Sequence, residues 1–128
     1  MSLTNPFETH TLEYLLTTTT VTRPTTWYIG LFTSDPTDTG AAGTEVSGFS
    51  YARTAVTFSV AADVASNTAG VEFPAASGGN WGTIGWIGIM DAATGGNMII
   101  HSALTTAKAI NAGDVFRIPT GDLDITAS

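Results

Sequence analysis

Residues 80–91 read Asn-Trp-Gly-Thr-Ile-Gly-Trp-Ile-Gly-Ile-Met-Asp, a stretch that can be buried and fully extended at once. They predict the central strand of a β-sheet. Strict alternation places Ile87 and Ile89 on one face and Ile84 and Met90 on the other. Both faces are therefore largely apolar, and other parts of the protein must cover each of them. The three glycines oppose a helix, because each costs about 1 kcal/mol relative to alanine in a helix interior.

Further short strands are predicted along the chain. Residues 92–97 form a turn that joins the central strand to a strand at 98–104 as an antiparallel hairpin. The other predicted strands are 27–33, 54–60, 71–74, 108–110, 114–119 and 123–126. The predicted fold is therefore all-β, an antiparallel β-sandwich or jelly-roll of about eight strands with one short N-terminal helix. The length allows a single domain over residues 1–128.

The N-terminal region, residues 1–20, predicts a short helix from Pro6 to about Leu16. Asn5 is expected to cap this helix, and Pro6 to occupy its first position, where the missing N–H costs no hydrogen bond. The β-branched run 17–20 ends it. Two interpretations stay open: the helix docks on its own sandwich, or it is an arm that lies on a neighbouring subunit.

A polar loop at residues 34–50 is longer than most structureless connections, and we expect it to contact a partner subunit, a carbohydrate or an ion. Asp35, Asp38 and Glu45 carry oxygen ligands of the kind that calcium accepts. Their spacing is not that of an EF-hand, and an Asp-Pro turn explains the same residues, so no metal site is predicted. Arg53 is expected to anchor the loop to the sandwich by an ion pair with Glu45 or Asp35.

The composition limits the possible partners. Only 12% of the residues are charged, the formal net charge is -7, and there is no cysteine. The basic residues are Arg23, Arg53, Lys108 and Arg117. Because they are scattered, they cannot form the basic stripe that phosphate binding needs, and we expect no nucleic-acid partner. A charge-poor surface fits a domain packed against other protein, although a monomeric β domain can share it. The absence of a long apolar run and of a secretory signal predicts no membrane partner and a chain that starts near Met1.

No catalytic constellation is present in the sequence. His10 lies on the predicted helix and His101 on an apolar strand, and no nucleophile elbow or other supporting context accompanies them. Trp27, Trp81 and Trp86 can offer an aromatic platform for sugars, but in a domain this small they more often fill the interior or an interface. Neither an enzymatic activity nor a cofactor is predicted.

Several segments, taken in their order and spacing, carry a resemblance that covers nearly the whole chain. They are Leu12-Glu-Tyr-Leu-Leu16, Trp27-Tyr-Ile-Gly-Leu-Phe-Thr-Ser-Asp-Pro36, Gly43-Thr-Glu-Val-Ser-Gly48, Tyr51-Ala-Arg53, Val71-Glu-Phe-Pro-Ala75, Trp81-Gly-Thr83, Gly88-Ile-Met-Asp91 and Asn111-Ala-Gly-Asp114. With them the chain resembles a family of small structural proteins of tailed bacteriophages, variously described as tail-fibre-like or as capsid cement or decoration proteins.

The resemblance implies a virion component without enzymatic activity, made in the host cytoplasm and located on the capsid surface. The expected function is that of a capsid cement protein, which binds the outer shell and clamps neighbouring major capsid proteins. The alternative is a tail-fibre or receptor-binding module of the phage tail. The expected partners are the major capsid protein and further copies of the chain, in a homodimer or homotrimer.

Contacts with these partners are expected from the helix and the long loop, because helix ends and long loops are usually exposed. The residues expected to make them are Phe7, Leu12, Tyr14, Asp35, Asp38 and Glu45.

Overall fold

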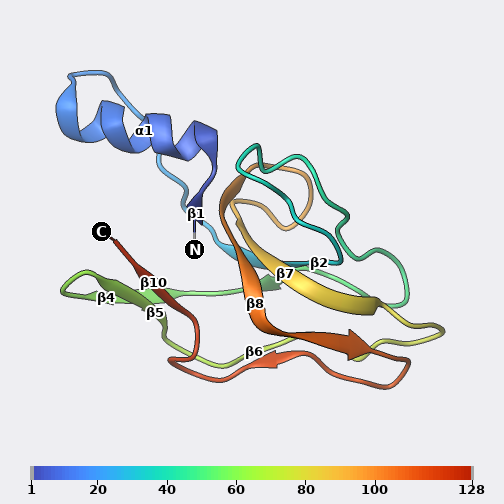
Figure 1. The fold of residues 1–128 in the computed structure, drawn as a ribbon. Coiled ribbons are helices and arrows are strands. Elements are labelled where there is room, and N and C mark those ends of the chain that lie inside the picture. The colour runs from blue at the N-terminus through green and yellow to red at the C-terminus, as the bar shows by residue number, and fades with distance from the viewer. Residues whose placement is uncertain (1, 128) are drawn as a thin grey trace.

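The computed structural model describes residues 2–127 and shows an all-β protein with one helix (Figure 1). Its strands form three sheets in which every pairing is antiparallel, which confirms the predicted antiparallel sandwich. In chain order the elements are β1 (Ser2–Leu3), α1 (Asn5–Leu16), β2 (Tyr28–Phe32), β3 (Thr54–Ala55), β4 (Phe58–Ala61), β5 (Val64–Asn67), β6 (Val71–Glu72), β7 (Gly82–Met90), β8 (Met98–Ile110), β9 (Arg117–Ile118) and β10 (Asp124–Thr126).

β7 is the central strand of the largest sheet, whose order is β1-β8-β7-β2-β3. On one side it pairs with β2, from Tyr28 opposite Met90 to Phe32 opposite Trp86. On the other side it pairs with β8, which follows it across the turn at residues 92–97. The predicted central strand and the predicted hairpin are both confirmed.

A register shift in this hairpin changes which side chains of β7 share a face. Ile84 pairs with Lys108 and Trp86 with Ala103, so residues 104–107 of β8 lie against the single residue between Ile84 and Trp86. Beyond this irregularity the alternation restarts, and Ile84 packs in the same core cluster as Ile87. The prediction of the opposite face for Ile84 is therefore wrong, because a bulge interrupts the period of two.

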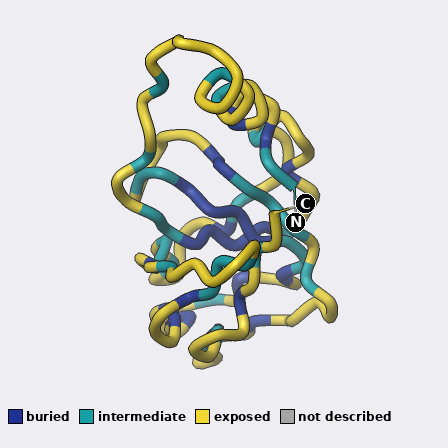
Figure 2. Tube along the Cα trace, turned by 90° about the vertical axis from the view of Figure 1, so that its left-hand side faces the viewer, coloured by how far each residue is buried: buried dark blue, intermediate teal, exposed yellow. Residues whose placement is uncertain are grey.

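The main core is formed by side chains from all three sheets, the large one and the two smaller ones, β10-β5-β4 and β6-β9. Phe73 lies at its centre with 1% of its surface exposed, and it meets Phe116 edge to face at 5.6 Å between ring centroids. A smaller cluster is formed by Phe32, Met90 and Met98. Phe32 follows the core residue Leu31 on β2, and Met90 follows the core residue Ile89 on β7. Because successive residues of a strand point to opposite faces, this cluster lies on the other face of the large sheet. Figure 2 shows that the buried segments concentrate in the central strands.

Several strand bounds differ from the predicted ones. The predicted strand 54–60 is two strands, β3 and β4, and the predicted strands 98–104 and 108–110 are one continuous strand, β8. β1 and β5 were not predicted: β1 has only two residues and is held by its pairing with β8, and β5 has the sequence Val-Ala-Ser-Asn, which becomes a strand between β4 and β10. Tertiary pairing overrides a weak local preference at both places.

Candidate functional site

The helix α1 begins directly after β1, and buried contacts hold its first turn. Thr4 is fully buried, and its Oγ1 donates a hydrogen bond to the Met98 carbonyl at 2.6 Å. The Asn5 N–H donates to the Asp38 carbonyl at 2.8 Å. The helix ends at Leu16 as predicted, but it begins at Asn5, one residue before the predicted start, so the N-cap is Thr4 and not Asn5. The Thr4 side chain makes no capping bond, because its hydroxyl is used by Met98.

Beyond its first turn, α1 projects from the sandwich (Figures 1 and 2). Phe7 is the buried residue of the helix and joins the main core. Because Phe7 is buried, little of its surface is available for the predicted contact with a partner. We call α1 and residues 17–26 the arm, and the exposed apolar residues of α1 the arm surface. The arm surface consists of Leu12 (58% exposed), Tyr14 (74%), Leu15 (67%) and Leu16 (76%).

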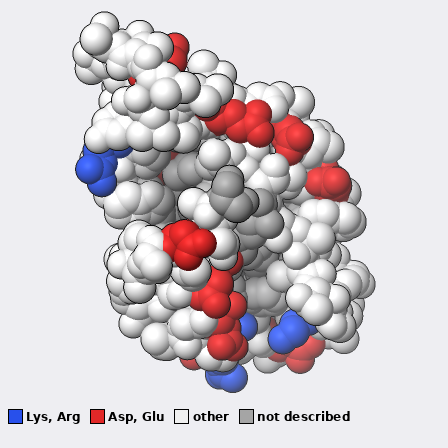
Figure 3. Space-filling view, turned by 60° about the vertical axis from the view of Figure 1, so that its left-hand side comes forward, with Lys and Arg blue, Asp and Glu red and all other residues white. Residues whose placement is uncertain are grey.

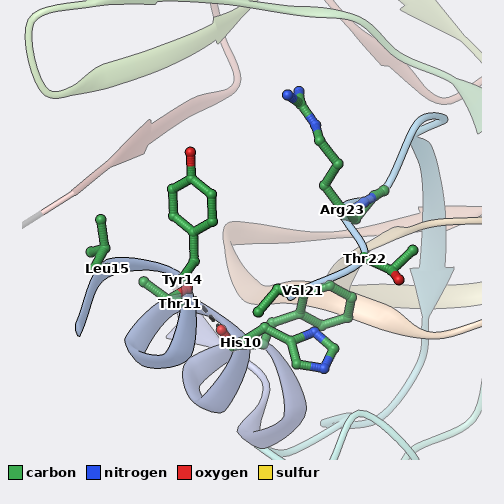
Figure 4. Close-up of a pocket in the computed structure, with 9 residues that line it drawn as sticks. His10, Thr11, Tyr14, Leu15, Val21, Thr22 and Arg23 are labelled. Carbon is green, nitrogen blue, oxygen red and sulfur yellow. Dashed lines mark hydrogen bonds between the residues drawn. The ribbon is translucent and has the colours of Figure 1, made fainter. Parts of the chain in front are cut away.

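A cavity of about 410 Å³ lies between α1 and residues 21–24, and we call it the arm cavity (Figure 4). Tyr14 and Arg23 extend in the same direction from its two walls, with Val21 between them. His10 also lines the cavity, and its ring meets Phe7 edge to face at 5.2 Å. The His10 Nδ1 atom is buried and has no hydrogen-bond partner within residues 2–127.

The arm cavity differs from the rest of the described structure in its unpaired basic groups. Elsewhere each basic side chain has a partner: Arg53 pairs with Glu45, His101 with Asp38 and Arg117 with Glu72, and Lys108 lies 5.8 Å from the ring centroid of Phe116. Within residues 2–127, Arg23 makes no ion pair and the His10 Nδ1 makes no hydrogen bond. Figure 3 shows red acidic atoms on the α1 end of the molecule, a blue basic group at its lower edge, and further acidic side chains spread over the face below it.

A second hollow of about 770 Å³ separates α1 from the β10-β5-β4 sheet. Its lining is mostly apolar and includes Leu3, Leu15, Val60, Ile100 and Ile125. The helix is therefore docked on its own sandwich through its first turn, while its C-terminal half stands away from the sheet. The first turn of the helix follows the docked interpretation, and the arm that lies on a neighbouring subunit stays a prediction for the C-terminal half.

The loop 34–50 is ordered by backbone contacts with β2. The Thr33 N–H donates to the Thr44 carbonyl at 2.9 Å, and the Val46 N–H donates to the Leu31 carbonyl at 3.0 Å. An isolated antiparallel bridge joins Phe32 and Glu45. The second half of the loop is therefore an irregular extension of the large sheet.

A cluster around Glu45 fixes this loop to the sandwich, and it confirms the predicted ion pair with Arg53. Arg53 Nε and Nη2 each donate to a carboxylate oxygen of Glu45 at 2.8 Å. Arg53 Nη1 donates to the carbonyls of Ala92 and Gly95 at 2.9 and 2.8 Å, which ties in the β7–β8 turn. The Tyr51 hydroxyl also donates to Glu45, at 2.7 Å.

The electrostatics of this cluster favour the ion pair. Burial by itself raises the pKa of Glu45, but the hydrogen bonds from Arg53 and Tyr51 outweigh it and leave the pKa below its ordinary value. Burial and the bond to Glu45 raise the pKa of the Tyr51 hydroxyl, which stays protonated as a donor. The hydrogen bond to Glu45 raises the pKa of Arg53. Glu45 therefore has an internal role, and its predicted contact with a partner stays a prediction.

The first half of the loop is attached through Asp38. Its Oδ1 lies 2.9 Å from His101 Nε2 on β8 and accepts a bond from the Ser2 hydroxyl at 3.3 Å. The hydrogen bond with His101 lowers the pKa of Asp38. Asp35 is exposed, and its Oδ1 accepts the Thr37 N–H at 2.9 Å. The partner contacts predicted for Asp35 and Asp38 also stay predictions.

The predicted contact residues thus occupy two neighbouring regions, the arm and the loop, which meet at the bond between Asn5 and Asp38. The sequence-based prediction omits Leu15, Leu16 and Arg23. One signal for the leucines is present in the sequence, because the apolar residues of 5–16 spread around the helix and one docked face cannot bury them all.

Other kinds of site have little support in the described residues. No group of three or more His, Asp or Glu side chains within residues 2–127 is arranged to hold a metal ion. Trp81 is 6% exposed and its Nε1 donates to the Phe49 carbonyl at 3.0 Å, so it belongs to the core. Trp27 and Trp86 are half-buried against the two core clusters. The helix α1 is too short and too polar to cross a membrane.

A family model described as podophage GP4 fiber I protein gp80 matches residues 2–126, nearly the whole chain. No curated protein sequence matches the chain.

Proposed function

Since the chain belongs to the podophage GP4 fiber I protein gp80 family, we propose that it is a component of the phage tail fibre without enzymatic activity. The family match identifies a phage structural protein of fibre type, and it is the observation that carries this proposal. It favours the tail-fibre alternative over the capsid cement function that the sequence first predicted. The family is named for a fibre protein and not for an enzyme.

The geometry supports a structural role. The sandwich is tied together by side-chain bonds between distant segments, such as those of Arg53 to Glu45 and to the β7–β8 turn. The arm, by contrast, exposes four large apolar side chains on a protein with few charges. Leu12, Leu15 and Leu16, spaced i, i+3 and i+4, share one side of α1. Exposed apolar patches on a soluble protein often mark interaction sites. We therefore propose the arm as the surface through which the protein joins the virion.

Capsid cement is the second candidate. The low charge and the absence of a predicted active site fit it as well as they fit a fibre component. A cement protein stabilises the shell by binding the assembled form better than the separate subunits. In that case the arm and the loop residues Asp35, Asp38 and Glu45 would contact the major capsid protein on the capsid surface.

Copy number and position in purified virions separate the two candidates. Quantitative mass spectrometry against the major capsid protein and the tail proteins gives the copy number. Gold-labelled antibodies against the folded domain give the position in electron micrographs. A fibre component is expected in a small number of copies, with label at the tail. A copy number comparable with that of the major capsid protein, and label over the head, would replace the fibre proposal by capsid cement. Absence from purified virions would overturn both.

A further inference from the structure

We infer that α1 closes onto the second hollow in the free protein, so that leucines of the arm surface cover the apolar side of the β10-β5-β4 sheet. In the open position described above, the same leucines are exposed and available to a partner. The closed position is therefore an autoinhibitory contact within the chain. Its consequence for assembly rests on the proposed role of the arm, whereas the movement of the helix does not.

The sheet wall of the second hollow is apolar. Val60 on β4 is opposite Ala65 on β5, and Ala65 is opposite Ile125 on β10, so the three side chains lie on the same face of the sheet. All three line the hollow. Leu3 and Ile100, an opposite pair of the large sheet, line it as well. Val60 is 73% exposed, although it is surrounded by other apolar side chains of this wall.

The helix turns matching apolar side chains toward this wall. Glu8, Thr11 and Leu15 line the second hollow and follow an i, i+3, i+7 spacing, so they mark the side of α1 that faces the sheet (Figure 1). Leu12 shares this side, because it lies four residues after Glu8 and three before Leu15. Leu12 and Leu15 are 58% and 67% exposed. The apolar group that faces the sheet across the hollow is therefore part of the same chain.

The attachment of α1 leaves its C-terminal half free to move. The helix is held at its first turn, through the contacts of Thr4, Asn5 and Phe7. Residues 18–25, which return from the helix to β2, make no hydrogen bond to the sandwich within residues 2–127. Leu15 lies about 12 Å beyond Phe7 along the helix axis, so a rotation of about 20° about Phe7 moves it by about 4 Å. The hollow can therefore narrow while the first turn keeps its contacts.

An engineered disulfide tests the closure. The sequence has no cysteine, so two introduced thiols have no competitors. Thr11→Cys and Ala65→Cys place one thiol on each wall of the hollow. They can be bridged only when their Cα atoms come within about 7 Å of each other, so the rate of oxidation of the double variant reports closure. The matched control pairs Ala65→Cys with Glu13→Cys, because Glu13 lies on the opposite side of the helix from Thr11. We expect the first pair to form its intramolecular disulfide at least tenfold faster than the control pair.

Two substitutions test whether apolar contact holds the closed position. Leu15→Gln keeps a good helix former and Val60→Thr keeps a β-branched strand residue, and each removes apolar surface from one wall. Each should slow the disulfide several-fold, and circular dichroism verifies that each variant keeps its fold. Equal rates for the two cysteine pairs overturn the inference. A rate that neither substitution changes overturns it as well.

Purified phage particles that lack this protein test the consequence for assembly. The variant with Thr11→Cys and Ala65→Cys is added with its disulfide either formed or reduced, and cosedimentation with the particles measures binding. We expect the reduced form to bind as the wild type does and the disulfide-closed form to bind at least tenfold less. Equal binding of the two forms overturns the autoinhibitory role. A wild-type chain that does not bind overturns the proposed role of the arm in the virion, whereas the disulfide rates decide independently whether the helix closes.

Discussion

Replacing Arg53 by methionine tests whether the Glu45 cluster holds the long loop on the sandwich. Methionine keeps an unbranched side chain and removes the guanidinium. The side chain of Arg53 is 10% exposed and that of Glu45 is 25% exposed, so the pair is mostly desolvated. The variant loses both bonds to Glu45 and the bonds to the carbonyls of Ala92 and Gly95.

The expected loss of unfolding free energy is about 3 kcal/mol. Removing one member of a buried ion pair costs about 3–5 kcal/mol, because the other charge is left without compensation. Glu45 keeps the hydrogen bond from Tyr51 and some contact with solvent, which places the expected value at the lower end. A domain of this kind has about 5–15 kcal/mol of stability in total, so the effect is large.

Urea unfolding followed by tryptophan fluorescence measures this loss, because Trp81 donates to the Phe49 carbonyl at the end of the same loop. The matched control is Arg117→Met. The Arg117–Glu72 pair has the same chemistry, but both side chains are 63% exposed, and its loss should cost less than about 1 kcal/mol. If Arg53→Met and Arg117→Met destabilise the protein equally, burial does not set the strength of the Glu45 pair and the reasoning is refuted.

Three other predictions concern pH, the core and the loop. Because the pKa of Glu45 is lowered in the folded protein, its contribution to stability is present above its ordinary value of 4.5 and is lost as the pH falls through the lower folded value. Urea midpoints between pH 6 and about 3 should therefore fall less for Glu45→Gln than for the wild type. Phe73→Ala should lower the unfolding free energy by about 3–5 kcal/mol in the same assay, and a loss below about 1 kcal/mol would contradict its central place in the core. Gly43→Ala should cost about 2 kcal/mol or more, because φ is +78° and the new Cβ would lie 2.7 Å from the Ser34 carbonyl oxygen. Gly113→Ala, with φ +91° and open space around it, should cost only about 1 kcal/mol, and equal losses would contradict the steric argument.

Local patterns were sufficient for the elements that depend on neighbouring residues. The helix ends at Leu16 as predicted, because the threonine run ends it, and Pro6 lies in its first turn, one residue after its start. The hairpin of β7 and β8 follows from two apolar runs separated by a turn-forming segment. An ion pair of Arg53 with Glu45 or Asp35 was also predicted, and the structure shows that Glu45 is the partner.

The sequence by itself determined the all-β class, the central strand and the place of the helix, because hydrophobic period and turn residues act over a few positions of the chain. Only the tertiary structure decided that Ile84 joins the core of Ile87, and that β5 is a strand at all, because a bulge and a strand pairing involve residues far apart in sequence. It also decided that the end of the helix is exposed, and that within residues 2–127 Arg53 and Arg117 make ion pairs and Arg23 makes none. Exposure and pairing are properties of the packed molecule, and no local pattern contains them.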